Sequence, residues 1–131
     1  MADDDVDDQN FLKLAVNKYS SNINVECVAN GVELLDYLHK KPEPDLIILD
    51  LNMPQKDGKT ALNEIKTSEQ LKHIPVLIYT TTTSPLEINT IYKLGANSFL
   101  SKPKSFSDIT SAVNLICAYW LKTISLPNIA G

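Results

Sequence analysis

The sequence has few cysteines and no long apolar run, and each shortage excludes a class of protein. Its 131 residues include two cysteines, Cys27 and Cys117, which are too few and too far apart for a disulfide framework or a cysteine-based metal site. No uninterrupted apolar run approaches the roughly 20 residues that a membrane-spanning helix needs. No positively charged, apolar secretory leader opens the chain. We therefore expect a cytoplasmic protein that does not span a membrane.

The sequence also lacks an excess of basic charge. It has 12 lysines and arginines against 16 aspartates and glutamates, a formal net charge of −4. Five aspartates stand within the first eight residues: Asp3, Asp4, Asp5, Asp7 and Asp8. The rest of the chain, with 12 basic and 11 acidic side chains, carries +1. A nearly neutral domain with an acidic head does not attract nucleic acid or an anionic membrane surface, so we expect neither as a partner.

The length and the apolar fraction of 44% indicate one globular domain with one core. We predict that this domain covers residues 1–125 and that a short tail, 126–131, follows it. A tail of this length holds no DNA-binding or catalytic module. Any signal is therefore expected to leave through a protein–protein surface and to reach a downstream protein target.

Apolar residues alternate between the spacing of a strand and the spacing of a helix along the whole chain. Helices are predicted over 8–19, 32–38, 61–65, 85–94 and 109–124, and strands over 22–29, 46–49, 75–79 and 98–101. The run 46–49 is continuously apolar, as in a strand that is covered on both faces of a parallel sheet. Strands that alternate with helices predict a parallel, doubly wound α/β domain.

Polar side chains follow these strands where each one ends. Asp50 follows 46–49, Thr80 follows 75–79, and Lys102 stands one residue beyond the last strand. In open α/β sheets ligands bind beyond the carboxyl ends of the strands, and the acidic head would reach the same rim. Converging carboxylates need a cation, and oxygen ligands suit Mg²⁺. A lysine and a hydroxyl stabilise a phosphoryl group, so the residues predict metal-assisted phosphoryl transfer onto Asp50.

These residues resemble a response-regulator receiver domain of two-component signalling. The motifs that carry the resemblance are Asp3-Asp4 before a helix, Asp50-Leu-Asn-Met-Pro54, Asp57-Gly58, Thr80 and Lys102-Pro103. The spacing resembles the chemotaxis-type single-domain receiver, which implies a flavodoxin-like, five-stranded parallel sheet of order 2-1-3-4-5. The segments 94–97 and 119–127 are similar to the small regulators that pair with phytochrome-like or other sensor kinases.

The resemblance implies a phosphoacceptor and a metal site. Asp50 would accept a phosphoryl group from a sensor histidine kinase or a phosphotransfer protein. Asp4 would ligate Mg²⁺ directly, Asp3 would hold its water ligands, and Asp50 with the backbone carbonyl of Asn52 would complete the protein ligands. The domain would then catalyse only its own phosphorylation and dephosphorylation.

The resemblance also implies how the phosphoryl group is held and how its presence is signalled. Lys102 would pair with the phosphoryl oxygens and Thr80 would hydrogen-bond to one of them. Phe99 stands at the position of the aromatic residue that repacks when Thr80 moves. The changed surface would lie within 85–121, and the bond between Lys102 and Pro103 would be cis.

Several alternatives stay open at this stage. Asp3 and Asp4 are also compatible with a solvated tail or with helix N-caps, and the acidic pair that binds the metal is uncertain by one position. Only Met1 and Ala2 precede Asp3, so we expect a first strand that is truncated or altered, or a gap that another chain fills. Without a first strand, the strand 46–49 would lie on an unpaired edge. Tyr119 and Trp120 are assigned to packing or to a dimer surface, which leaves a homodimer open.

Two rival functions are weighed against the receiver. A phosphatase of the haloacid dehalogenase type also uses an aspartate at the end of a strand. It needs a second aspartate two residues later as general acid, but Asn52 stands there and has no carboxyl proton to donate. The other rival is an interaction module that keeps the receiver fold and takes no phosphoryl group.

Overall fold

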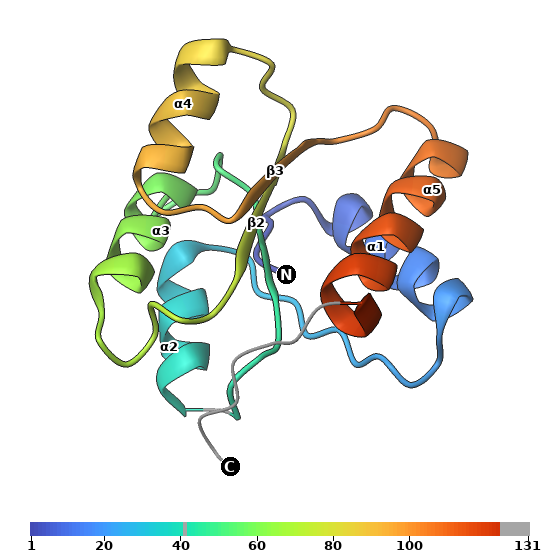
Figure 1. The fold of residues 1–131 in the computed structure, drawn as a ribbon, viewed down its shortest axis with the longest axis horizontal. Helices are drawn as coiled ribbons and strands as arrows, with labels where there is room; N and C mark the ends of the chain where they lie inside the picture. The colour runs from blue at the N-terminus through green and yellow to red at the C-terminus, as the bar shows by residue number, and fades with distance from the viewer. Residues whose placement is uncertain (41, 124–131) are drawn as a thin grey trace. The chain divides into compact units, whose positions relative to one another are not determined.

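A computed structural model describes residues 1–40 and 42–123, which fall into two compact units (Figure 1). The first unit comprises the described residues of Met1–Asp4 and Cys27–Lys102, and the second comprises Asp5–Glu26 and residues 103–123. The predicted tail, 126–131, lies outside the described residues. Within the described part, no helix is both long enough and apolar enough to cross a membrane.

The first unit is built on a parallel sheet of three strands in the order β1-β2-β3. The strands are β1 (Ile47–Leu49), β2 (Val76–Thr80) and β3 (Ser98–Ser101). All five residues of β2, the middle strand, are buried. The predictions of strands over 46–49, 75–79 and 98–101 are therefore confirmed, as is the parallel pairing.

Ala2 takes the place of the predicted first strand. It forms isolated parallel bridges to Val28 on one side and to Leu49 on the other. The order 2-1-3-4-5 is thus kept, although the first two positions are bridges rather than strands. The expected shortening of the first strand is confirmed, whereas the strand predicted over 22–29 is reduced to the single bridge at Val28. Val28 pairs with the Met1–Asp3 segment through one donated and one accepted backbone hydrogen bond, which form a bridge and not a ladder.

Ala2 also prevents the unpaired edge that a missing first strand would leave. Its N–H donates to the carbonyl of Ile48 at 2.9 Å, and its carbonyl accepts from the N–H of Asp50 at 2.9 Å. On the other side, Val28 donates to Met1 at 2.9 Å and Asp3 donates to Val28 at 3.0 Å. Four backbone hydrogen bonds therefore hold this short segment between its neighbours.

Three helices of the first unit lie on one face of its sheet: α2 (Gly31–Lys40), α3 (Gly58–Thr67) and α4 (Pro85–Lys93) (Figure 1). Their apolar sides and the sheet form one core. Its fully buried members include Leu49, Leu62, Ile65, Ile78 and Ile91. Burying a side chain of this size contributes about 1.5–3 kcal/mol, which makes this core the main source of the unit's stability.

The ends of α3 and α4 follow local chemistry in the sequence. Asp57 caps α3 by accepting a hydrogen bond from the N–H of Thr60, and Ser84 caps α4 with Pro85 in its first turn. Gly95 follows the last turn of α4 with φ of 106°, a conformation that glycine adopts without strain. These caps fix where the helices that border the site begin.

Asp57 makes the stability of the first unit dependent on pH. Hydrogen bonds from Thr60, first from its backbone N–H, lower the pKa of Asp57 from its ordinary value of 3.8. The ionised cap therefore stabilises the fold above pH 3.8, and this contribution is lost as the pH falls through the lowered, folded-state pKa. We expect Asp57→Ala to cost about 1 kcal/mol of unfolding free energy at pH 7. Urea denaturation at pH 7 and at lower pH should show the difference shrinking, and a constant difference would contradict the assignment.

The second unit contains α1 (Val6–Tyr19), α5 (Phe106–Cys117) and a π-helical continuation of α5, η1 (Ala118–Thr123). The rings of Phe11 and Phe106 join α1 to α5, with centroids 6.0 Å apart. Asp5 caps α1 by accepting hydrogen bonds from the N–H groups of Asp7 and Asp8. Cys117 is buried, as predicted for a small core residue, and burial raises the pKa of its thiol.

Candidate functional site

Three aspartates gather at the carboxyl end of β1. Asp3, Asp4 and Asp50 each offer a carboxylate oxygen, and these oxygens lie within 4.8 Å of one another. Asp3 is 0% exposed and Asp50 is 5% exposed, whereas Asp4 is exposed to solvent. Ala2 brings them together, because its carbonyl accepts from the backbone of Asp50 and Asp3 follows it directly. The acidic pair predicted from the sequence is thus adjacent to Asp50.

Lys102 supplies a positive charge to this cluster. Its Nζ lies 2.8 Å from Oδ2 of Asp3 and 3.5 Å from Oδ2 of Asp50. The backbone N–H of Lys102 donates to the carbonyl of Thr80 at 2.7 Å, which ties the end of β3 to the end of β2. Three carboxylates and one ammonium leave two negative charges in a largely buried site, and a divalent cation would balance them.

Thr80 ends β2 with a hydroxyl that has no described partner. Its side chain is fully buried, and among the described residues no group hydrogen-bonds to Oγ1. An unsatisfied buried hydroxyl costs about 1–3 kcal/mol relative to a bonded one. A ligand with an acceptor oxygen at this place would satisfy it. The Thr80 hydroxyl can therefore donate a hydrogen bond to a ligand at the carboxyl end of β2, the strand next to the one that Asp50 follows.

Two glycines, Gly31 and Gly58, pack closely against the backbone of the loop 50–58, which contains Asp50. A Cβ on Gly58 would lie 2.1 Å from the carbonyl oxygen of Asp50, and one on Gly31 would lie 2.6 Å from the carbonyl oxygen of Lys56. Both glycines donate their N–H groups to this loop, Gly58 to Leu51 and Gly31 to Lys56, each at 2.9 Å. The motif Asp57-Gly58 was noted in the sequence, but the close approach that requires glycine is visible only in the structure.

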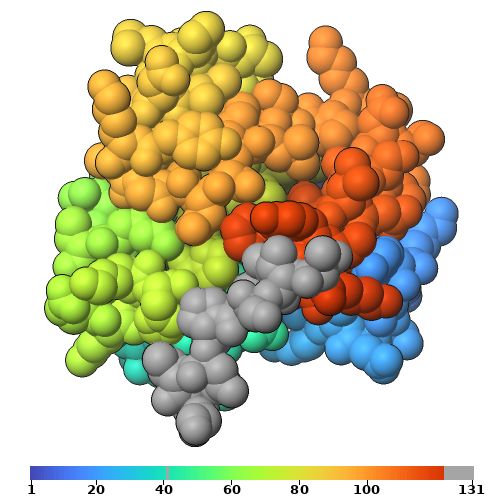
Figure 2. Space-filling model, viewed as in Figure 1, coloured from blue at the N-terminus to red at the C-terminus, as the bar shows by residue number. Residues whose placement is uncertain are grey.

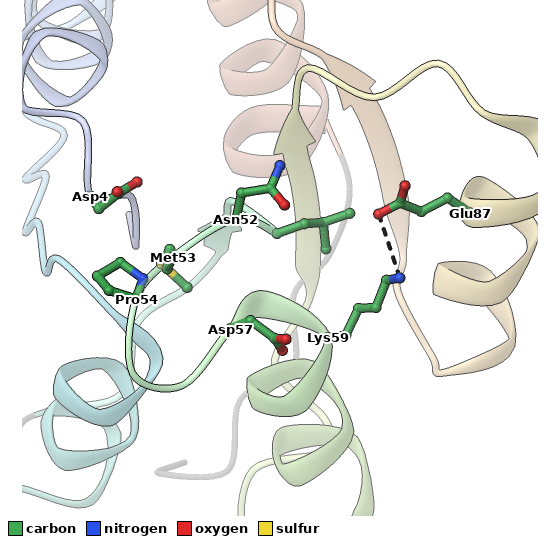
Figure 3. A pocket seen from close by; sticks show the side chains of 8 residues that line it. Asp4, Asn52, Met53, Pro54, Asp57, Lys59 and Glu87 are labelled. Carbon is green, nitrogen blue, oxygen red and sulfur yellow. Dashed lines mark ion pairs between the residues drawn. The ribbon is translucent and has the colours of Figure 1, made fainter.

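A pocket opens beside the acidic cluster (Figure 3). Its lining comprises Asp4, Leu51, Asn52, Met53, Pro54, Asp57, Lys59 and Glu87. Asn52 thus lies on the wall of the pocket together with Asp4. Lys59 and Glu87 lie together on one side of the pocket, opposite Asp4, with Nζ and Oε1 3.5 Å apart (Figure 3). Sequence reasoning missed this pair, because two single charges on different helices give no local signal in the sequence.

Two further predictions concern the switch aromatic and the last proline. Phe99 is partly buried on β3 and packs against the core, with Ile78 of β2 as its register partner. The predicted cis bond between Lys102 and Pro103 is wrong, since no described peptide bond is cis. The trans form is the more stable isomer of an X–Pro bond by about 0.5–1 kcal/mol.

Comparison with known proteins identifies the family. The profile described as response regulator receiver domain matches residues 1–114. The chain belongs to this family. The resemblance inferred from Asp3-Asp4, Asp50, Thr80 and Lys102 is confirmed, and the haloacid dehalogenase alternative is not supported.

The receiver domain has relatives of known sequence and structure. Response regulator Rcp1 of Synechocystis sp. is 42% identical over 86 residues, which are 66% of this chain and 58% of Rcp1. The probable methanogenesis regulatory protein FilR2 of Methanothrix harundinacea is 40% identical over 102 residues, 74% of this chain and 66% of FilR2. The matches thus span less than two thirds of these curated relatives.

Solved structures confirm the α/β receiver fold. The phosphorylated cyanobacterial phytochrome response regulator RcpA superposes with a TM-score of 0.92 at 33% identity, covering 97% of this chain and 95% of RcpA. The Mn²⁺-bound form of Rcp1 gives a TM-score of 0.85 at 32% identity, with coverage of 97% and 96%. The predicted likeness to the small phytochrome-associated regulators is therefore confirmed.

Proposed function

We propose that this receiver domain accepts a phosphoryl group on Asp50 in a two-component phosphorelay. The observation that carries the proposal is the convergence of Asp3, Asp4 and Lys102 on Asp50, with the unsatisfied hydroxyl of Thr80 on the neighbouring strand. The donor would be a sensor histidine kinase or a phosphotransfer protein. The phosphorylated state described for RcpA supports this chemistry in a protein of similar fold.

The residues of the site fit Mg²⁺ as the cofactor. They offer oxygen ligands alone, and their net charge of two negative units matches a divalent cation. Asp3, Asp4, Asp50 and the backbone carbonyl of Asn52 would hold the metal. When bound, the cation would neutralise charge that builds up on the phosphoryl oxygens. The Mn²⁺-bound form of Rcp1 supports a divalent cation in a similar protein.

The chain's own residues would carry out the transfer. A carboxylate oxygen of Asp50 would attack the phosphorus of a phosphohistidine; the new P–O bond forms as the P–N bond breaks, and the imidazole leaves with the electron pair. Lys102 would pair with a phosphoryl oxygen, and the hydroxyl of Thr80 would donate to another. The domain would act on no other substrate, so its catalysis is confined to its own phosphorylation and dephosphorylation.

The output of the receiver domain would be a protein–protein contact that depends on phosphorylation. Thr80 and Phe99 lie on adjacent strands, with Thr80 opposite Ser101 and Phe99 opposite Ile78. A hydroxyl drawn toward the phosphoryl group would change the packing around Phe99 and shift an equilibrium between two surfaces. A downstream protein that binds one of them would read the signal.

The proposal is tested by intact-mass measurement after incubation with Mg²⁺ and acetyl phosphate. We expect one phosphoryl adduct on the wild type, none on Asp50→Asn, and none in EDTA. Circular dichroism of the variant should match the wild type, because aspartate and asparagine have almost the same shape. A folded wild-type protein that takes no phosphoryl group would overturn the proposal and favour the phosphate-independent interaction module.

A further inference from the structure

The ion pair between Lys59 and Glu87 has no part in the transfer described above. Lys59 stands in the first turn of α3 and Glu87 in the first turn of α4, and both line the pocket that contains Asp4 and Asn52 (Figure 3). Their side chains are 45% and 29% exposed. A pair this exposed contributes little to stability, about 0–1 kcal/mol, so its position at the pocket suggests another role.

Local hydrogen bonds hold the carboxylate of Glu87 over the pocket. In a capping box, a glutamate at this position would reach back to the N–H of Ser84, the N-cap of α4. Here the N–H of Ser84 donates to Oγ1 of Thr82 at 3.3 Å, and the hydroxyl of Thr82 donates to Oε2 of Glu87 at 3.1 Å. The other oxygen, Oε1, faces Lys59. Thr82 and Lys59 thus each contact one carboxylate oxygen of Glu87, and together they keep its negative charge at the pocket.

The pocket borders Asp50, because its lining includes Leu51 and Asn52, which follow Asp50 directly, and Asp4 of the acidic cluster, so charges in the pocket act on ions that approach Asp50. Phosphodonors are anions, and they must come close to a cluster that carries two net negative charges. Glu87 adds a repulsive charge and Lys59 adds an attractive one, and each reduces the effect of the other while they are paired. Charges that line a cleft change the local concentration of an ionic reactant and its rate of association.

We propose that Lys59 and Glu87 form a specificity-determining charge pair that sets how readily anionic phosphodonors reach Asp50. This inference rests on the proposed function. Lys59 favours entry of the donor, Glu87 opposes it, and the intact pair keeps the two effects in balance. The pair acts on access to the site and leaves the transfer step itself to Asp50, Lys102 and Thr80.

The two single variants distinguish a charge effect from a structural one. Glu87→Gln and Lys59→Gln both break the ion pair. If the pair only held α3 and α4 in place, both variants would shift the half-saturating concentration of acetyl phosphate in the same direction. The charge pair predicts opposite directions. We expect Glu87→Gln to lower the half-saturating concentration of acetyl phosphate about threefold to tenfold at low ionic strength, and Lys59→Gln to raise it by a similar factor.

Further comparisons sharpen the test. The maximal rate should stay the same in both variants, the double variant should lie near the wild type, and high salt should shrink both shifts. Phosphoramidate, which carries less negative charge than acetyl phosphate at neutral pH, should give smaller shifts. Glu64→Gln is the matched control, because Glu64 pairs with Lys56 at 2.6 Å and is not part of the pocket lining.

Binding of Mn²⁺, measured by calorimetry, provides a readout that needs no phosphorylation. Because the metal is a cation, the shifts should reverse: Glu87→Gln should weaken its binding and Lys59→Gln should strengthen it. Two results would overturn the charge pair and leave the proposed function intact, provided that the wild type is phosphorylated on Asp50. One is a shift in the same direction in both single variants; the other is a half-saturating concentration and a Mn²⁺ affinity that stay unchanged in both. A wild type that takes no phosphoryl group overturns the proposed function, and with it the role of the pair.

Discussion

Gly58→Ala is expected to destabilise the receiver domain by about 3 kcal/mol and to abolish phosphorylation of Asp50. The new methyl group would lie 2.1 Å from the carbonyl oxygen of Asp50 and 2.7 Å from Cα of Leu51. Both atoms belong to the backbone, so neither can swing aside as a flexible side chain would. Alanine favours a helix over glycine by about 1 kcal/mol, which is too little to offset this overlap. The loop must move, and the carboxylate of Asp50 moves with it.

Urea denaturation and intact-mass measurement with acetyl phosphate check this prediction together. Asn63→Ala is a suitable control, since Asn63 lies exposed on the same helix, α3, and should change the unfolding free energy by less than about 0.5 kcal/mol. If Gly58→Ala kept both the stability and the phosphoryl adduct of the wild type, the close packing of α3 against the loop would have no functional importance.

Lys102→Met should have an effect of similar size for an electrostatic reason. The substitution keeps much of the side chain's apolar volume and removes the ammonium group 2.8 Å from Asp3 and 3.5 Å from Asp50. Both carboxylates are almost completely buried. Breaking a buried ion pair from one side costs about 3–5 kcal/mol, because a charge is left in a poorly solvating environment. We also expect the phosphoryl adduct to be lost.

The electrostatic origin can be separated from packing by adding metal. Mg²⁺ should restore part of the stability of Lys102→Met, since a divalent cation compensates the same carboxylates. Lys72→Met provides the control: Lys72 pairs with Glu69 on the surface, with side chains 50% and 84% exposed, and its loss should have almost no effect. Equal unfolding free energies for the wild type and Lys102→Met in EDTA would show that the ammonium group does not stabilise the cluster.

Much of the fold and of the site could be predicted because the signals are local. The apolar run 46–49 predicts a buried strand by itself, and the rule that ligands bind where parallel strands end then selects Asp50, Thr80 and Lys102. The structure brings Asp50 and Lys102 into contact and places Thr80 at the end of the neighbouring strand. Their roles in phosphoryl transfer remain proposals that the mass measurement will decide.

The predictions that failed depend on contacts distant in sequence. The β-branched alternation of 22–29 reflects strand propensity, but a strand also needs a ladder of backbone partners, and the sheet bridge described in this segment is the one at Val28. The register of the acidic head was open for the same reason. The bridge through Ala2 brings Asp3 and Asp4 to the cluster with Asp50, whereas Asp5 caps α1; that Asp3 and Asp4 bind a metal stays a proposal.

The bridge at Ala2 also makes the assembly of the site a local folding event. Four backbone hydrogen bonds hold the segment in place, and if they opened together Asp3 and Asp4 would leave the cluster with it. Small segments of this kind open at a lower free energy than the core does. Docking of the segment and binding of the proposed cation would therefore be linked equilibria. Each would strengthen the other by the same factor, so the affinity for metal would include the free energy of pairing Ala2 with its two neighbours in the sheet.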